Sequence, residues 1–117
     1  MKRELKVSKD CQNPEETLKE LKLGYINLAD GFFDLAQTNF DLVILADPYN
    51  ADAFWGLMLC KCQIRDENVL SSNATLYKNI IFLKEYQNAL LYADEMQKAI
   101  FNDLLSEILK VNAGDNY

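Results

Sequence analysis

Three cysteines and a set of paired carboxylates carry the most reactive chemistry in this sequence. Cys11, Cys60 and Cys62 are odd in number, no Cys-x-x-Cys pair is present, and the chain has no His. The Cys60-x-Cys62 pair would serve a thiolate metal site or a redox switch. Because the other ligands of such a site are missing, we favour the alternative that the thiols are small buried apolar groups in a reducing compartment.

Acidic pairs are the second group of candidates for chemistry. The pairs are Glu15 with Glu16, Asp94 with Glu95, and Asp103 with Glu107. Paired carboxylates act as acid and base only where burial or a neighbour shifts a pKa, and each pair lies on an expected exposed helix face. The chain also lacks His, a Gly-rich phosphate loop, and a Ser or Cys with a candidate base. We therefore expect no enzyme activity, no metal and no cofactor; an enzyme would need a deep pocket with a buried carboxylate pair.

The composition is typical of one compact domain. The chain has 117 residues, of which 50% are hydrophobic and 26% charged. Its formal net charge of -6 repels phosphate backbones and anionic lipid headgroups, so neither nucleic acid nor a membrane is an expected partner. The longest apolar run uninterrupted by Gly, residues 42–46, is far shorter than the roughly 20 residues of a membrane helix, and no signal-peptide core follows Met1. We expect a cytoplasmic protein.

Few breakers interrupt the chain, which has only 4 Gly and 2 Pro. The hydrophobic pattern predicts an all-α domain of about five helices over residues 13–111. Residues 1–12 are charged and lack a sustained apolar face, so they are either a frayed arm or a short docking segment. Residues 112–117 are expected to form a loose tail.

Local signals place the first three helices. The first should begin with Asn13 as N-cap and Pro14 in the first turn. It should stop at Asp30-Gly31, where either Gly31 closes the helix in the left-handed conformation or a tight turn forms. The second is expected over about residues 32–46, and the third over about residues 51–64 after a turn that contains the second proline. Because the third helix is apolar almost all round, we expect it to be central and packed on both faces.

The C-terminal half has a weaker pattern. A polar linker is followed by a helical pattern that resumes at Thr75 and has a break near Lys84. The last helix is predicted over residues 94–111, with Met96, Ile100, Leu104 and Ile108 at four-residue steps.

The two prolines, Pro14 and Pro48, are 34 residues apart. A shift by this distance also superimposes Leu23 on Leu57. Thirty-four residues is the period of the tetratricopeptide repeat (TPR), in which each unit is a pair of antiparallel helices. In that frame the positions of the first unit's Leu-Gly pair, turn, and small and large packing residues are filled by Leu23, Gly24, Gly31, Phe33, Ala36, Phe40 and Pro48. The frame is lost after residue 64, so we expect a short, closed array.

Two longer segments resemble a TPR-like helical module common in Firmicutes. Residues 47–59 read Asp-Pro-Tyr-Asn-Ala-Asp-Ala-Phe-Trp-Gly-Leu-Met-Leu, and residues 86–95 read Tyr-Gln-Asn-Ala-Leu-Leu-Tyr-Ala-Asp-Glu. The module usually lies inside longer bacterial multidomain proteins, often after a zinc ribbon or beside a signalling or effector domain, and its own activity is undefined. The resemblance covers about residues 14–111 and implies antiparallel helical hairpins in a right-handed array. It departs from the repeat at Asn27 and Met58, and no zinc-ribbon cysteines precede it.

The resemblance implies a concave surface formed by the inner helices. The positions that match it are Lys22, Tyr25 and Ala29 on the first helix and Asp52, Trp55, Leu59 and Cys62 on the third. Such a groove would hold a short peptide or helix of a partner or of the parent chain, with Tyr25 and Trp55 as anchors. The alternative is that Trp55 belongs to the core beneath the C-terminal helices.

We therefore expect a non-catalytic protein interaction module, a scaffold or adaptor. The alternative is a self-associating domain without a separate groove. In that alternative an exposed apolar stripe on the last helix, formed by Ile100, Phe101, Leu104 and Leu105, would build a homodimer.

Overall fold

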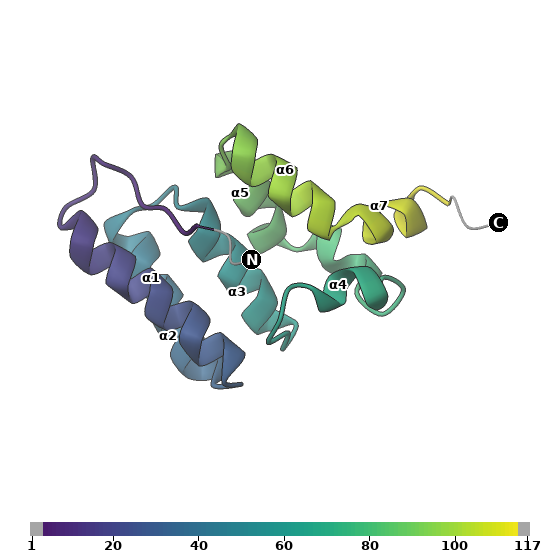
Figure 1. Cartoon of the computed structure of the whole chain (residues 1–117), viewed down its shortest axis with the longest axis horizontal. Helices are drawn as coiled ribbons and strands as arrows, with labels where there is room; N and C mark the ends of the chain where they lie inside the picture. Colours follow the sequence, from purple (N-terminus) through teal and green to yellow (C-terminus); the bar gives the residue numbers. More distant parts are fainter. Residues whose placement is uncertain (1–3, 115–117) are drawn as a thin grey trace.

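The computed structural model describes residues 4–114, and this part of the chain contains helices and no strand (Figure 1). In chain order the elements are α1 (Pro14–Ala29), α2 (Phe33–Ala46), α3 (Ala51–Lys61), α4 (Val69–Ser72), the 3-10 helix η1 (Lys78–Phe82), α5 (Lys84–Tyr92), α6 (Glu95–Leu104) and α7 (Ser106–Asn112). The predicted all-α class is confirmed. No helix among residues 4–114 is long and apolar enough to span a bilayer.

Helices α1 and α2 form an antiparallel hairpin. Pro14 occupies the first turn of α1 with two acidic residues behind it, as predicted. Asn13 is the N-cap residue of this helix, as predicted, but it has a φ of 53° and makes no side-chain cap hydrogen bond. At the other end Gly31 has a φ of 83°, which a residue without Cβ adopts at low cost, and α2 starts at Phe33.

Helix α3 is the central element of the fold. It packs against α1, α2 and α5. The side chain of Asn50 caps it by accepting the backbone N–H of Ala53 at 2.9 Å. The helix ends at Lys61, three residues before the predicted end, because Gln63 takes the left-handed conformation with a φ of 56°. Its lack of a polar face correctly predicted burial on both sides.

The close approach of the first three helices depends on one aromatic ring between two glycines. A Cβ atom built on Gly24 of α1 would lie 2.6 Å from the ring of Phe40 on α2, and one built on Gly56 of α3 would lie 2.4 Å from the same ring. Phe40 is fully buried. The ring therefore fills space that two side chains would otherwise occupy.

The C-terminal half is more broken than the pattern predicts. The segment from Thr75 forms a turn and then η1, and α5 begins after the extended residue Leu83, near the expected break. The predicted last helix is two helices, α6 and α7, which meet at Leu105 with φ -95° and ψ 0°. The molecule is elongated, 50 × 29 × 27 Å, with the α1–α2 hairpin at one end and α7 at the other (Figure 1).

Candidate interaction site

The N-terminal arm, residues 4–8, is an extended strap that crosses the helices. Leu5 and Val7 are partly buried against the core. Glu4, Lys6 and Ser8, which alternate with them along the chain, are exposed. This alternation is the period of two expected of an extended backbone. Of the two alternatives for residues 1–12, residues 4–8 fit the short docking segment and not the frayed arm. Residues 1–3, and residues 115–117 of the expected tail, lie outside the described residues.

Three side chains hold the arm by its backbone. Two lie in the turn between α2 and α3, Asp47 and Asn50, and the third, Asp52, lies in the first turn of α3. The N–H of Lys6 donates to Oδ2 of Asp52 at 3.0 Å, and the N–H of Ser8 donates to Oδ2 of Asp47 at 2.9 Å. Nδ2 of Asn50 donates to the carbonyl oxygen of Lys6 at 2.9 Å. We call Asp47, Asn50 and Asp52 the clamp. These three hydrogen bonds go to main-chain groups of Lys6 and Ser8 and therefore do not involve the side chains of the arm.

The clamp residues are themselves fixed in place. Their exposed fractions are 6% for Asp47, 4% for Asn50 and 0% for Asp52. Asn50 also donates to Oδ2 of Asp47 at 3.0 Å. Tyr25 on α1 donates its hydroxyl to the carbonyl oxygen of Asp52 at 2.6 Å. With the arm docked, these contacts hold the clamp in one geometry.

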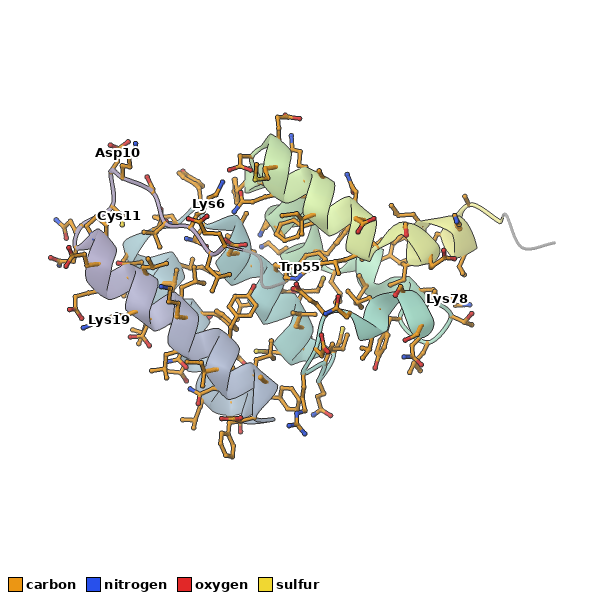
Figure 2. The ribbon with its side chains drawn as sticks, in the orientation of Figure 1. Lys6, Asp10, Cys11, Lys19, Trp55 and Lys78 are labelled. Carbon is orange, nitrogen blue, oxygen red and sulfur yellow. The ribbon has the colours of Figure 1, made fainter. Side chains whose placement is uncertain are left out.

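Helix α6 borders the same site. Nε2 of Gln97 donates to Oδ2 of Asp52 at 3.2 Å, and Nζ of Lys6 donates to Oδ2 of Asp94 at 3.0 Å. In Figure 2, Lys6 lies where the arm crosses the N-terminal end of α3. Hydrogen bonds from the backbone of Gln97 and from Lys6 lower the pKa of Asp94, and the hydrogen bond and charge of Asp94 raise the pKa of Lys6.

Among the predicted groove residues, the clamp region includes Asp52 and the Tyr25 hydroxyl. Lys22 is exposed on α1. Trp55 and Leu59 are 0% and 1% exposed, so neither offers a surface for a partner. The proposed anchor role of Trp55 is therefore wrong, and the core alternative holds. Figure 2 shows Trp55 near the centre of the molecule, beside α6.

Trp55 is buried because α6 covers it. Its ring stacks on that of Phe101, with centroids 4.2 Å apart and 8° between the planes. Its indole N–H donates to Oε1 of Glu67 at 2.8 Å, which satisfies the one polar atom of the ring.

The expected dimer stripe on the last helix is also wrong as an exposed surface. Phe101 and Leu105 are fully buried, and Ile100 and Leu104 are partly buried against the core. The amphipathic pattern of α6 and α7 is present, but the side chains of the stripe pack against the core of the same molecule. Exposed apolar side chains occur elsewhere, and the most exposed large one is Leu45 at 81%.

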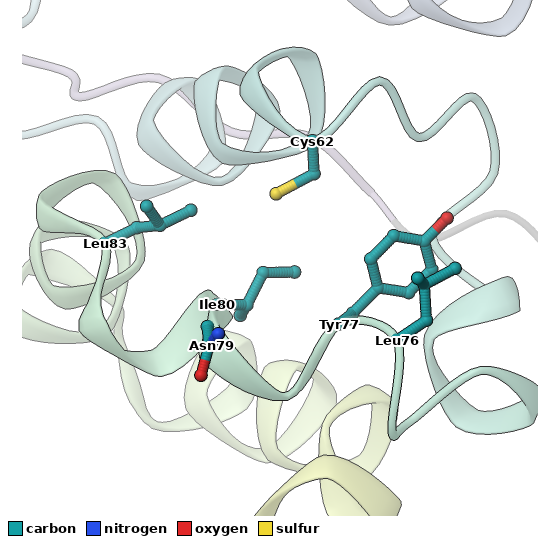
Figure 3. Close-up of a pocket in the computed structure, with 6 residues that line it drawn as sticks. All are labelled: Cys62, Leu76, Tyr77, Asn79, Ile80 and Leu83. Carbon is teal, nitrogen blue, oxygen red and sulfur yellow. The ribbon is translucent and has the colours of Figure 1, made fainter.

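The residues considered for chemistry remain dispersed. Glu15, Glu16, Asp94, Glu95, Asp103 and Glu107 are all exposed. Burial raises the pKa of the Cys60 thiol to about 11 and also raises that of Cys62, so both favour the neutral thiol. Residues 4–114 contain no group of three or more metal-ligating side chains. A pocket of about 150 Å³ beside Cys62 is lined mainly by apolar side chains (Figure 3): Leu76, Tyr77, Asn79, Ile80 and Leu83.

Sequence reasoning missed Asp47 and Asn50 as site residues. Both stand in the Asp-Pro-Tyr-Asn turn, which explains their presence by chain reversal alone. The available signal was the alternation of Leu5 and Val7 in the arm, which fits an extended segment with one apolar face.

Comparison with known proteins adds no relative. No protein-family model matches the sequence. A search of curated proteins and a search of solved structures give no match either.

Proposed function

We propose that this chain is a non-catalytic protein–protein interaction module, a TPR-like scaffold or adaptor in the cytoplasm that holds a short peptide of a partner or of a parent chain. The observation that supports this proposal is the clamp: it already binds an extended peptide, residues 4–8, through main-chain hydrogen bonds on alternate residues. Peptide capture by backbone hydrogen bonds with side-chain packing between them is a common mode of recognition.

Two features make this site a better candidate than the others. Its hydrogen-bonding groups are buried, whereas the carboxylate pairs considered for chemistry are exposed. It also combines polar groups with apolar packing for Leu5 and Val7, so an occupant gains both hydrogen bonds and apolar burial.

A binding assay on the full chain tests the proposal. In the arm-released variant, Leu5→Asp with Val7→Asp, the arm carries two charges in place of its two packed apolar side chains. A labelled synthetic peptide with the sequence of residues 1–8 should then bind, as measured by fluorescence anisotropy. Adding Asp52→Ala should weaken this binding at least tenfold, because the peptide N–H loses its acceptor.

The matched control is Leu45→Asp with Leu76→Asp, which adds the same charges at side chains that are 81% and 73% exposed. Circular dichroism and the fluorescence of Trp55 verify that each variant is folded. If the folded arm-released variant binds no peptide, the module proposal is wrong.

A further inference from the structure

We call the clamp, Asp94 and the core surface under Leu5 and Val7 the arm site. It is occupied by the chain itself, and its surroundings are acidic. The backbone N–H groups of Lys6 and Ser8 donate to the carboxylates of Asp52 and Asp47, and the carboxylate of Asp94 accepts a hydrogen bond from the ammonium group of Lys6. These acids come from the turn before α3, from α3 itself and from the start of α6. Three carboxylates therefore lie beside the arm.

We infer that the clamp, together with Asp94 and the core surface under Leu5 and Val7, selects an extended partner segment with an apolar–basic–apolar pattern. The arm, with Leu5, Lys6 and Val7, competes for this site from within the chain. This inference rests on the proposed function and adds the class of partner and its regulation. A basic residue at the central position meets Asp94, whereas an acidic one meets like charge there. Apolar residues on either side occupy the places of Leu5 and Val7 against the core.

The net charge supports a basic partner. The chain carries -6 overall, so a segment with a cation is attracted before contact and an acidic one is repelled. At the site itself Lys6 and Asp94 are 42% and 49% exposed, so salt screens their attraction. Selection by charge should therefore weaken at high ionic strength, while selection by the apolar residues should remain.

The geometry of the connection makes the arm an effective competitor. Only residues 9–13 separate the arm from the start of α1. A short connection of this kind gives an effective local concentration on the order of millimolar. A partner binds only the fraction of molecules from which the arm has left, so its apparent affinity falls in proportion to that fraction.

The test uses full-length protein and three labelled peptides: the sequence of residues 1–8, the same peptide with Lys6→Glu, and the same peptide with Leu5→Ser and Val7→Ser. Against the arm-released variant, the first peptide should bind best. The Lys6→Glu peptide should bind about fivefold weaker at low salt, with the difference shrinking in 0.5 M NaCl. The serine peptide should bind at least tenfold weaker at either salt concentration.

The competition is measured with the first peptide and two proteins. The wild-type chain should bind it at least tenfold more weakly than the arm-released variant does, whereas the control Leu45→Asp with Leu76→Asp should bind as the wild type does. Equal binding by wild type and arm-released variant would overturn the competition.

The outcomes separate the two proposals. If the arm-released variant binds the three peptides equally well, the module function stands and the selectivity is refuted. If it binds none of them while folded, the proposed function fails. Tighter binding of the acidic peptide than of the basic one would overturn the charge argument.

Discussion

Trp55 of α3 and Phe101 of α6 stack face to face, with centroids 4.2 Å apart and an interplanar angle of 8°. Both side chains are fully buried. The pair joins the central helix to the C-terminal half and thereby holds Asp94 and Gln97, at the start of α6, beside the clamp. The stack is therefore part of what positions the arm site.

Removal of the Phe101 ring should strongly destabilise the domain. Phe101→Ala should lower the free energy of unfolding by about 3–5 kcal/mol, because it leaves a cavity against Trp55. Urea unfolding followed by Trp55 fluorescence measures this change. Phe82→Ala, at a side chain that is 69% exposed, is the control and should change stability by less than about 0.5 kcal/mol. Similar effects of the two substitutions would contradict the packing described here.

The two glycines against Phe40 should not tolerate alanine. Gly24→Ala or Gly56→Ala places a Cβ within 2.6 or 2.4 Å of the ring, so each should cost about 1–3 kcal/mol, although alanine is the better helix former. Chemical denaturation of the single variants gives the cost.

A double-mutant cycle tests the cause of that cost. Combining Gly24→Ala with Phe40→Leu should cost less than the sum of the two single changes, since the smaller side chain makes room for the methyl group. Additive effects would show that the ring is not the obstacle.

The backbone amides of Lys6 and Ser8 should be protected from hydrogen exchange. Each donates to a clamp carboxylate, so each should exchange at least about tenfold more slowly than in an unstructured peptide. Asp47→Ala should abolish the protection of Ser8 in particular, because its amide then loses its acceptor. Unprotected amides in the wild-type chain would contradict the docking of the arm.

The contact between Lys6 and Asp94 should persist through neutral pH and fail at both extremes. Hydrogen bonds from Gln97 and Lys6 hold the pKa of Asp94 below 3.8. The stabilising contribution of the ionised carboxylate is therefore complete above pH 3.8 and is lost as the pH falls through the lowered pKa. Asp94 holds the pKa of Lys6 above 10.5. The stabilising contribution of the protonated ammonium group is therefore complete below pH 10.5 and is lost as the pH rises through the raised pKa.

Chemical shifts of the arm amides, followed against pH, should show both transitions. Asp94→Asn removes the acidic transition while leaving a residue able to cap α6, so it separates the charge from the cap. An unchanged acidic transition in that variant would assign it to another group.

Cys60 should be the slowest thiol to react in the folded protein. Its side chain is buried, and burial raises its pKa to about 11, so little thiolate exists at pH 8. A thiol-specific reagent at pH 8 should modify Cys11 before Cys60, and unfolding should equalise the rates. Rapid modification of Cys60 in the native state would contradict its burial.

Local patterns predicted the N-terminal helices better than the C-terminal ones. The proline, acidic and glycine signals around α1 act within one turn, so they could be located from neighbouring residues alone. The helix breaks at Leu105 although the apolar residues around it keep a regular four-residue spacing, so nothing in the neighbouring sequence signals that break. The apolar surround of Trp55 correctly indicated burial, while its residue type alone favoured a binding anchor, and packing by Phe101 decides between them.

The arm site was harder to predict because its parts are far apart in sequence. Lys6 is separated in sequence by 46 positions from Asp52 and by 88 positions from Asp94. Residues 1–12 are charged and have no helical period, so without knowledge of their partners the sequence also fits a frayed segment. The pattern of Leu5 and Val7 is too short to specify a surface by itself.

The contact between Lys6 and Asp94 spans 88 positions, so it cannot form until α6 has been synthesised. During synthesis the arm emerges long before α6, so the acidic partner of Lys6 is not yet present and the α1–α2 hairpin forms with the arm incompletely held. Closing a loop of this length is among the late, entropically costly steps of folding. In a nascent chain the clamp residues are therefore complete before Asp94, the acidic partner of Lys6, is available to hold the arm.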